Sequence, residues 1–250
     1  MTHKKHPLFC YCDKMKQMCG RFVRSSPISS VAEAFNIQQA SIEIAPSYNI
    51  SPTQEIVIIN KKGTKQLMQC TWGFLPSWAR DPSMGSKMIN ARAETVASKP
   101  TFKSAFRKQR CLVIADGFYE WHKIKNKKTP VYIHLKSGRP FGFAGLYNPW
   151  TSPEGKTFCT CTIITTSANE LLEPIHDRMP VIIPRDKEDL WLNPEEQDQG
   201  VLLGLLKPYP SEEMEMHEVS AKVNYPKYNS PEAIKPVFKD LRQRPQGVSL

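Results

Sequence analysis

The chain lacks the segments that would carry it into or across a membrane. Its N-terminal region has lysines and histidines but no apolar run of the ~7 to 15 residues that a signal peptide needs. No stretch reaches the ~18 consecutive apolar residues of a spanning helix. These absences predict a protein with no membrane partner, in the cytosol or nucleoid of a bacterium or in the nucleus of a eukaryote. Internal repeats and low-complexity segments are also absent, and a composition of 40% hydrophobic and 23% charged residues is typical of a folded globular chain.

The cysteines do not form the framework of a small secreted protein. Seven is an odd number, and they are scattered through a chain of 250 residues, so we expect reduced thiols. The two C-x-C pairs lack the two to four intervening residues typical of zinc sites. The second pair alternates with polar residues in a strand-like run, which favours small buried side chains. We therefore expect no metal and no cofactor. The cysteines are Cys10, Cys12, Cys19, Cys70, Cys111, Cys159 and Cys161.

Positive charge is in excess. The formal net charge is +10, of which the first eighteen residues supply +3 and the remainder +7. A basic surface attracts polyanions by releasing counterions and by steering encounter, so nucleic acid is the first partner to test. A basic protein with no such partner explains the charge equally well.

The local patterns predict one α+β domain. Ser26-Pro27 followed by spaced apolar residues indicates a short helix, and residues 55–74 indicate a hairpin. Closely spaced β-rich segments from 110 to 166 predict mostly antiparallel, curled β-sheets with short flanking helices packed outside. Further helices are expected at 102–106, 170–175, 187–192 and 200–206, and a proline-rich tail that wraps or dangles is expected from residue 225. We expect an N-terminal extension over 1–18, the domain over 19–236 and a C-terminal tail over 237–250.

Cys19 stands in the unusual stretch KQMCGRF, directly after Met18. If a chain began at Met18 and lost that methionine, Cys19 would carry a free α-amine beside its thiol. An amine and a thiol on adjacent carbons capture an aldehyde in two steps, a Schiff base and then a five-membered thiazolidine ring. The alternative is a buried structural cysteine.

Polar residues interrupt four stretches that otherwise resemble core strands. Glu120 lies among Phe118, Tyr119 and Trp121, an apolar setting that would raise the pKa of its carboxyl group and suit it to proton transfer. A surface glutamate on an edge strand fits the same periodicity. His176 lies between two prolines in a stiff loop and is an acid or base candidate. The polar residues of these stretches are Asn90, Arg92, Glu94, Asp116, Glu120, Thr165, His176, Asp177 and Arg178.

Two tryptophans frame a loop at residues 72–78. Trp72 is expected in the core, whereas Trp78 stands in a proline-containing loop before Arg80. An exposed aromatic ring stacks on bases of a single strand, at ~1 to 3 kcal/mol per base. Trp78 is thus either a wedge against DNA or an anchor for its own loop.

Seven motifs, taken together in order, resemble the SOS-response-associated peptidase (SRAP) family of abasic-site processing proteins. They run from about residue 18 to about 236 and read MCGRF, YNISP, WGFLPSW, INARAET, ADGFYEW, IHDRMPVII and HEVSAKVN. The resemblance implies a barrel-like fold. It also implies covalent capture of abasic sites in single-stranded DNA during the DNA damage response, through a thiazolidine on an N-terminal cysteine. We further expect a monomer with an abasic-site lyase side activity.

Residue by residue, the resemblance implies a catalytic set and a DNA-binding set. Cys19 would form the crosslink, Asn90 would orient the cysteine and sugar, Glu120 would shuttle protons, and His176 would assist ring opening and crosslink reversal. Trp78 fits the family's wedge, but the next position is Ala79, which weakens it. The DNA-binding set is Arg21 and Arg92 on phosphates, Asn49, Pro52 and Thr165 lining the pocket, and Trp78 as the wedge.

Two other functions compete with covalent capture. One is a thiol peptidase or amidohydrolase (hydrolase activity) with Cys19 as nucleophile and His176 as base. The other is a non-covalent single-stranded DNA-binding module, which leaves Cys19, Glu120 and His176 without a role. Three explanations fit residues 1–18: translation that begins at Met18, a propeptide removed at the Met18–Cys19 bond by the protein itself or by another, or a retained extension.

Overall fold

A computed structural model describes residues 19–38, 42–125 and 127–237. The N-terminal extension expected over 1–18 and the tail expected over 237–250, apart from residue 237, lie outside the described residues, as do Cys10 and Cys12. The domain boundaries therefore stay predictions. In the described part of the chain, no helix is long and apolar enough to cross a membrane.

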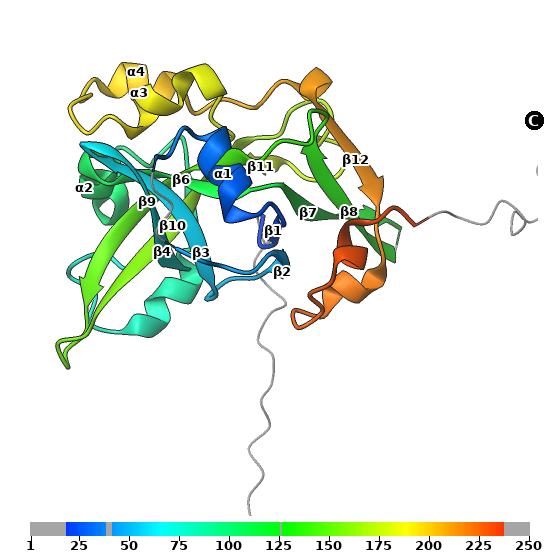
Figure 1. Cartoon of the computed structure of the whole chain (residues 1–250), viewed down its shortest axis with the longest axis horizontal. Helices are drawn as coiled ribbons and strands as arrows, with labels where there is room; N and C mark the ends of the chain where they lie inside the picture. Colours follow the sequence, from blue (N-terminus) through cyan, green and yellow to red (C-terminus); the bar gives the residue numbers. More distant parts are fainter. Residues whose placement is uncertain (1–18, 39–41, 126, 238–250) are drawn as a thin grey trace, which may run out of the picture.

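The centre of the fold is a five-stranded barrel (Figure 1). Four of its strand pairs are antiparallel, in the order β4–β3–β6–β9–β10. Parallel pairing of β10 with β4, at Thr160 with Thr71 and Cys161 with Trp72, closes the ring. Closure leaves these strands without free edges. The strands are β3 (Glu55–Lys62), β4 (Thr64–Trp72), β6 (Arg110–Ala115), β9 (Phe141–Thr151) and β10 (Thr157–Ser167).

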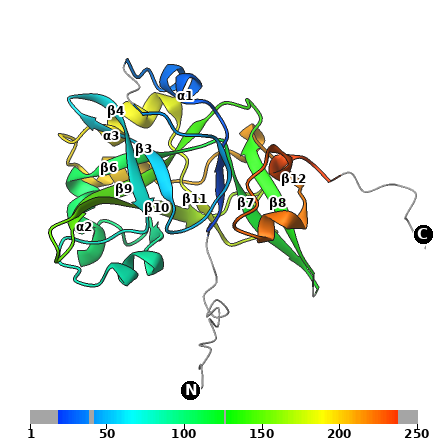
Figure 2. The ribbon, with the colours of Figure 1, turned by 60° about the horizontal axis from the view of Figure 1, so that its bottom comes forward.

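A second, open sheet lies beside the barrel and is fully antiparallel (Figure 2). Its order is β12–β8–β7–β1–β2. The first and last described strands of the chain, β1 and β12, thus belong to the same sheet. The strands are β1 (Phe22–Arg24), β2 (Ser47–Ile50), β7 (Gly117–Ile124), β8 (Lys127–Leu135) and β12 (Met214–Glu218).

Two short strands extend β10 beyond the barrel. β5 (Asn90–Arg92) runs parallel to it, with Asn90 opposite Ile163 and Arg92 opposite Thr165. β11 (Arg178–Pro180) pairs with it antiparallel, with Pro180 opposite Thr165. Three motifs that are far apart in sequence therefore meet at the end of one strand.

The helices are short, as expected, but one prediction is wrong. Residues 170–175 form consecutive turns rather than a helix. Pro174 lacks the N–H that a helix would need and restricts the residue before it. The helices are α1 (Ile28–Ala34), α2 (Pro100–Lys108), α3 (Glu188–Leu192) and α4 (Gln199–Gly204), and the 3-10 turns are η1 (Pro82–Lys87), η2 (Arg185–Lys187), η3 (Ser211–Glu213), η4 (Ala221–Asn224) and η5 (Pro231–Ile234).

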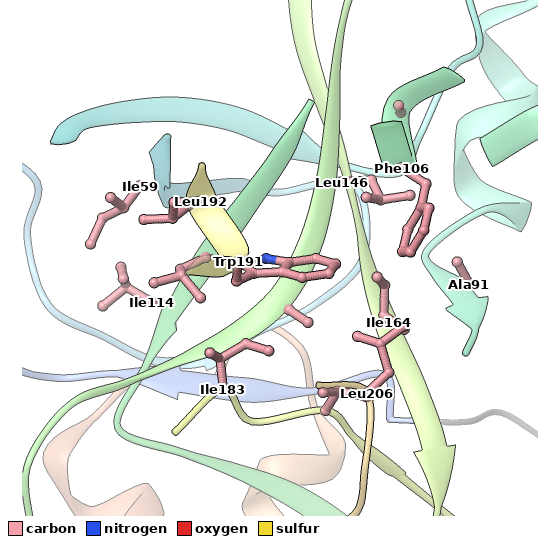
Figure 3. Packing of buried hydrophobic residues seen from close by; sticks show 14 of the residues in the cluster. Ile59, Ala91, Phe106, Ile114, Leu146, Ile164, Ile183, Trp191, Leu192 and Leu206 are labelled. Carbon is pink, nitrogen blue, oxygen red and sulfur yellow. The ribbon is translucent and has the colours of Figure 1, made fainter. Parts of the chain in front are cut away.

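The helices cover a core on the outer face of the barrel, centred on the fully buried Trp191 (Figure 3). Beside it the guanidinium group of Arg110 is buried, which lowers its pKa to about 10, and donates to backbone carbonyls that include Trp191 O at 2.7 Å. Buried cations need such partners because desolvation is costly. Residues from far-separated segments share this core: Ile59, Ala91, Phe106, Ile114, Leu146, Ile164, Ile183, Trp191, Leu192 and Leu206.

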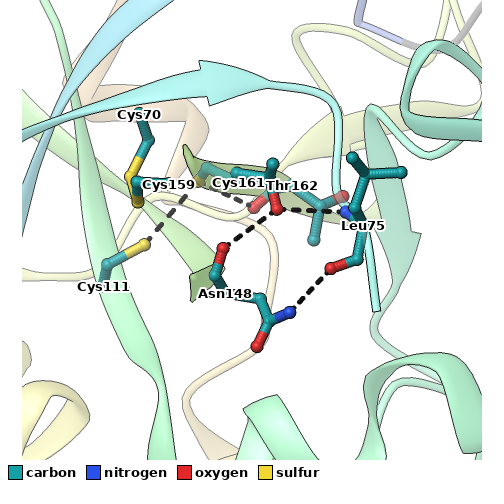
Figure 4. The surroundings of a disulfide bond; sticks show 8 residues. Cys70, Leu75, Cys111, Asn148, Cys159, Cys161 and Thr162 are labelled. Carbon is teal, nitrogen blue, oxygen red and sulfur yellow. Dashed lines mark hydrogen bonds between the residues drawn. A yellow bond between two sulfur atoms is a disulfide. The ribbon is translucent and has the colours of Figure 1, made fainter. Parts of the chain in front are cut away.

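A second core joins the barrel interior to the open sheet and contains several sulfur atoms (Figure 4). The expectation of reduced thiols is wrong for one pair, because Cys70 on β4 and Cys159 on β10 form a disulfide. The parallel register of β4 and β10 places these two cysteines side by side. Cys111 and Cys161 are free thiols whose Sγ atoms lie 3.8 Å apart. Both are fully buried, which was predicted for Cys161. The same prediction is wrong for Cys159, which is half-buried and disulfide-bonded.

Candidate functional site

Cys19 lies directly before β1, at the junction of the two sheets. Its side chain is 2% exposed. The carboxyl group of Glu120, from the middle of β7, accepts a hydrogen bond from the backbone N–H of Cys19. Asn90, at the start of β5, donates from Nδ2 to the carbonyl oxygen of Cys19 at 3.3 Å. Three predicted site residues from separate motifs are therefore gathered around one backbone segment.

The electrostatics of this pocket favour neutral groups. Burial raises the pKa of the Cys19 thiol well above its usual value, and the charge of Glu120 raises it further. Burial likewise raises the pKa of Glu120 to about 8, although the N–H groups of Cys19 and Trp121 oppose this shift. Glu120 is 3% exposed on a central strand, so the surface-glutamate alternative is wrong. At neutral pH the pocket holds a carboxylic acid beside the nitrogen of Cys19.

His176 lies in the loop between β10 and β11, next to Asp177. Its Nδ1 accepts a hydrogen bond from the N–H of Arg178 at 3.0 Å and lies 3.2 Å from Oδ1 of Asp177. The charge of Asp177 contributes to the raised pKa of Glu120. The loop that carries His176 is therefore close enough to influence Glu120 electrostatically.

Arg21 and Asn49 support a part of the chain that the sequence did not assign to the site. Arg21 Nη1 donates to Asn49 Oδ1 at 2.7 Å and to the carbonyl of Val223 at 2.9 Å. Asn49 is 2% exposed, and its Nδ2 donates to the carbonyls of Val223, Tyr225 and Tyr228. These hydrogen bonds hold the turns that follow β12. The motif HEVSAKVN, which ends at residue 224, was the one sequence signal that this region belongs with the site.

The remaining predicted DNA-binding residues differ in exposure. Arg92 is exposed on β5, opposite Thr165 of β10. Thr165 is fully buried, and its carbonyl oxygen accepts from Arg178 Nη2 at 2.6 Å. Arg178 also forms a bidentate pair with Glu94. Pro52 is half-buried in the turn between β2 and β3.

Trp78 projects from the loop between β4 and η1. It is 58% exposed, whereas Trp72 is fully buried, as expected. Ala79 is buried, and its carbonyl oxygen accepts from Trp150 Nε1 at 2.8 Å, so position 79 faces inward and Trp78 alone forms the projecting ring. The loop begins at Gly73, whose φ is +147° and where a Cβ would lie 2.8 Å from the carbonyl oxygen of Gly85; only glycine fits there.

A cavity of about 510 Å³ lies elsewhere, between the tip of the β3–β4 hairpin and α3. None of the predicted site residues lines it. Among the described residues, no group of three or more His, Cys, Asp or Glu side chains is arranged to hold a metal ion. The cavity is lined by Asn36, Gln38, Lys61, Thr64, Lys65, Gln66, Leu67 and Asp189.

Comparisons with known proteins agree with the motif pattern. The family model described as SOS response associated peptidase (SRAP) matches residues 18–226. The chain is 50% identical over 221 residues to the abasic site processing protein YoqW of Bacillus subtilis, covering 87% of this chain and 99% of that protein. It is 32% identical over 232 residues to the abasic site processing protein HMCES of Xenopus tropicalis, covering 80% and 69%.

Solved structures show the same fold. A crystal structure of a protein from Bacteroides thetaiotaomicron superposes with a TM-score of 0.81 at 28% identity, covering 88% of this chain and all of that one. The predicted single α+β domain with a barrel-like sheet is therefore confirmed. On the match of its sequence and fold, the chain belongs to the SRAP family.

Proposed function

We propose that the protein processes abasic sites in single-stranded DNA by forming a covalent thiazolidine crosslink through Cys19. The observation that carries this proposal is the buried carboxyl group of Glu120, with its pKa raised to about 8, held against the nitrogen atom of Cys19. That nitrogen is the atom that would attack an aldehyde. The names of the relatives, abasic site processing proteins, support the same substrate.

The chemistry begins on the ring-opened sugar, whose C1′ is an aldehyde carbon. The unprotonated amine of Cys19 attacks C1′, and the carbinolamine then loses one water to give an imine. Protonated Glu120 donates a proton to the hydroxyl group, which leaves as water. The resulting carboxylate then takes back the proton that the nitrogen loses when the imine forms. The thiol of Cys19 next adds across the imine, its sulfur to carbon and its proton to nitrogen. One water leaves in total, and a neutral five-membered ring forms.

The order of these steps suits the pocket. A thiol with a raised pKa is a poor first nucleophile, because only the thiolate attacks readily. In this sequence the amine attacks first, and the thiol then meets an imine already held next to it, so proximity replaces thiolate character. Asn90, bound to the carbonyl oxygen of Cys19, fixes the orientation of both reacting groups. His176, beside Asp177, would assist sugar ring opening.

The reaction requires a free amine on Cys19, so the reactive species is a chain that begins at this residue. An acylated nitrogen forms neither imine nor thiazolidine. Intact mass spectrometry of the protein from its native cell tests this requirement directly. A chain that starts at Cys19 supports the mechanism, and a chain that retains the preceding residues contradicts it.

The decisive experiment mixes the trimmed protein with a single-stranded oligonucleotide that bears one abasic site. We expect an adduct that survives denaturation, has the summed mass minus one water, and leaves Cys19 resistant to thiol alkylation. A reducible imine that leaves the thiol free would contradict the ring. Peptide cleavage without an adduct would instead indicate the peptidase alternative. Salt-sensitive binding alone would indicate the non-covalent module, which the net charge and exposed Trp78 also fit.

A further inference from the structure

The residues after β12 form a strap, residues 219–237, that is fastened to the rim of the Cys19 pocket. Asn49 Nδ2 donates to three of its carbonyls, those of Val223, Tyr225 and Tyr228, at 3.2, 3.1 and 2.9 Å. Arg21 Nη1 adds a hydrogen bond to Val223 O at 2.9 Å. In Figure 1 the orange-to-red turns of the strap lie beside β2. A segment with little regular structure is thus held in one conformation.

The strap is tied to both chain segments that form the pocket. Arg21 is two residues from Cys19, and Trp121, the neighbour of Glu120, donates from Nε1 to Asn224 Oδ1 at 2.7 Å. The guanidinium group of Arg21 also lies 5.9 Å from the centre of the Trp121 ring. The strap is therefore hydrogen-bonded to residues one and two positions away from Glu120 and Cys19.

What the strap presents to solvent is an aromatic ring among cations. Tyr225 is 72% exposed, more than Trp78 at 58%. Lys222 and Lys227, three residues before it and two after it, are both exposed, and residues 219–231 contain no aspartate or glutamate. The ammonium group of Lys222 lies 5.7 Å from the centre of the Tyr228 ring.

Tyr225 is also pre-organised. Its φ of −87° and ψ of 112° place it in extended backbone, the region that the following residue, Pro226, imposes. Its N–H donates to Lys222 O at 3.0 Å and its carbonyl oxygen accepts from Asn49. Because the backbone on both sides is fixed, a ligand that stacks on the ring pays little ordering entropy.

We propose that Tyr225 is a stacking site for a base of the single strand whose abasic sugar enters the Cys19 pocket, with Lys222 and Lys227 contacting the phosphates on either side of that base. This inference rests on the proposed function for the identity of the strand. The lesion itself offers no base to hold, so affinity must come from neighbouring nucleotides. Stacking on an aromatic ring suits this need because every base has a π-face.

The test uses intact single-stranded oligonucleotides, which carry no aldehyde and cannot crosslink. We expect Tyr225→Ala to weaken binding by about 5-fold or more, the lower end of base–aromatic stacking, without changing the slope of affinity against salt. Lys222→Ala with Lys227→Ala should reduce that slope. Tyr225→Phe keeps the ring and should bind as the unaltered protein does. Leu203→Ala, which truncates an exposed side chain on α4, is the control for surface substitution.

A second measurement locates the base. The fluorescent adenine analogue 2-aminopurine, placed at successive positions beside a stable abasic analogue, should be quenched at one position by the unaltered protein and at none by Tyr225→Ala. Equal affinity and equal quenching in the Tyr225→Ala variant would overturn the proposal. Crosslinking to an aldehyde-bearing strand is measured in parallel and reports the proposed function separately. Loss of stacking appears in the binding assay, and loss of the covalent step appears in the crosslinking assay.

Discussion

Cys19 and Cys111 are both buried thiols whose pKa burial raises well above the usual value, yet their surroundings differ. Cys111 lies inside the barrel, with the sulfur of Cys161 at 3.8 Å and apolar side chains around it. Cys19 has the carboxyl group of Glu120 at its nitrogen and the amide of Asn90 at its carbonyl oxygen.

The contrast shows that burial does not distinguish a reactive cysteine from a structural one. Either thiol alone is inert at neutral pH, because the thiolate is disfavoured in both places. The surroundings of Cys19 differ in having two polar side chains, Glu120 and Asn90, directed at its backbone, while the N–H of Arg21 faces the sulfur. That arrangement fits the proposed mechanism, in which the nitrogen attacks the aldehyde first and the sulfur adds to the imine afterwards.

Removing each sulfur atom should give the largest difference between the two regions. We expect Cys19→Ala to abolish the denaturation-resistant adduct while leaving salt-sensitive binding to intact strands. Cys111→Ala should keep the adduct and lower the free energy of unfolding by about 1–2 kcal/mol. Gel analysis of the adduct and chemical denaturation of both variants provide the measurements. An adduct formed by Cys19→Ala would refute the role of Cys19.

Glu120→Gln tests whether the carboxyl group of Glu120 is the proton donor. We expect the crosslinking rate to fall by about 10²- to 10⁴-fold, the usual contribution of a positioned acid or base. In the trimmed protein with Glu120 the rate should pass through a maximum, because the α-amine is protonated below ~8 and Glu120, whose pKa burial raises, loses its proton at alkaline pH. The variant should lose the alkaline decline. Single-turnover rates from pH 6 to pH 10 check this, and an unchanged profile would contradict it.

The same substitution should raise stability at alkaline pH. The folded-state pKa of Glu120 is about 8, above the ~4.3 of an unfolded glutamate. The full stability is therefore present below pH ~4, and it falls as the pH rises through about 8, by on the order of 3 to 5 kcal/mol. Glu120→Gln should flatten that dependence. Urea denaturation at pH 5 and at pH 8.5 measures the difference, and parallel curves for the two proteins would show that Glu120 ionises normally.

Breaking the Cys70–Cys159 disulfide should affect the sulfur-rich interior but not the reactive pocket. The bond closes a loop of 89 residues, so in the chain-entropy account its loss costs about 4 kcal/mol of unfolding free energy. We expect Cys70→Ala with Cys159→Ala to lower the thermal midpoint and to form the adduct at an unchanged rate. Calorimetry and adduct yield measured below the midpoint separate the two effects. Slower adduct formation would show that the disulfide also supports the site around Cys19.

Asn49→Ala should have a smaller effect, confined to the strap. It removes the side-chain donor of the Tyr225 and Tyr228 carbonyls, while Val223 O keeps the hydrogen bond from Arg21, and we expect a loss of about 2–4 kcal/mol of unfolding free energy. Hydrogen exchange should accelerate in residues 219–237 more than in the barrel. Exchange that rises uniformly across the chain would show that Asn49 supports the whole fold rather than the strap.

Much of the fold follows from local patterns. The hairpin over 55–74 and the helix after Pro27 are found where alternation and apolar spacing predict them. The predicted cap is wrong, because the helix begins at Ile28 with Pro27 as its N-cap and no side chain caps it. Strand β12 was missed because its residues, MEMHE, combine charge with an edge position and lack β-branched side chains. The barrel-like sheet was expected only from the family resemblance, because the closure depends on just two residue pairs between β10 and β4, which no local pattern specifies. The disulfide depends on that same long-range register.

The features of the site also divide into those that local sequence predicts and those that depend on distant residues. The apolar neighbours of Glu120 predicted its raised pKa, because the shift comes mainly from burial in its own strand. Trp78 was predicted as exposed or anchoring, and it is exposed. By contrast, the partners of Arg21 and Asn49 come from residues about 170 to 200 positions later, which no local pattern specifies.

The position of the strap in the sequence also affects when its contacts near Cys19 form during synthesis. The carbonyls that Arg21 and Asn49 bind belong to residues 223–228, near the end of the described chain. During synthesis, Cys19 leaves the ribosome long before these residues exist, so the hydrogen bonds between Arg21, Asn49 and the strap form only after about 200 further residues have been made. A nascent chain therefore exposes its cysteine before the strap is attached, and under the proposed function it would hold a damaged strand in register only after residues 223–228 have been added.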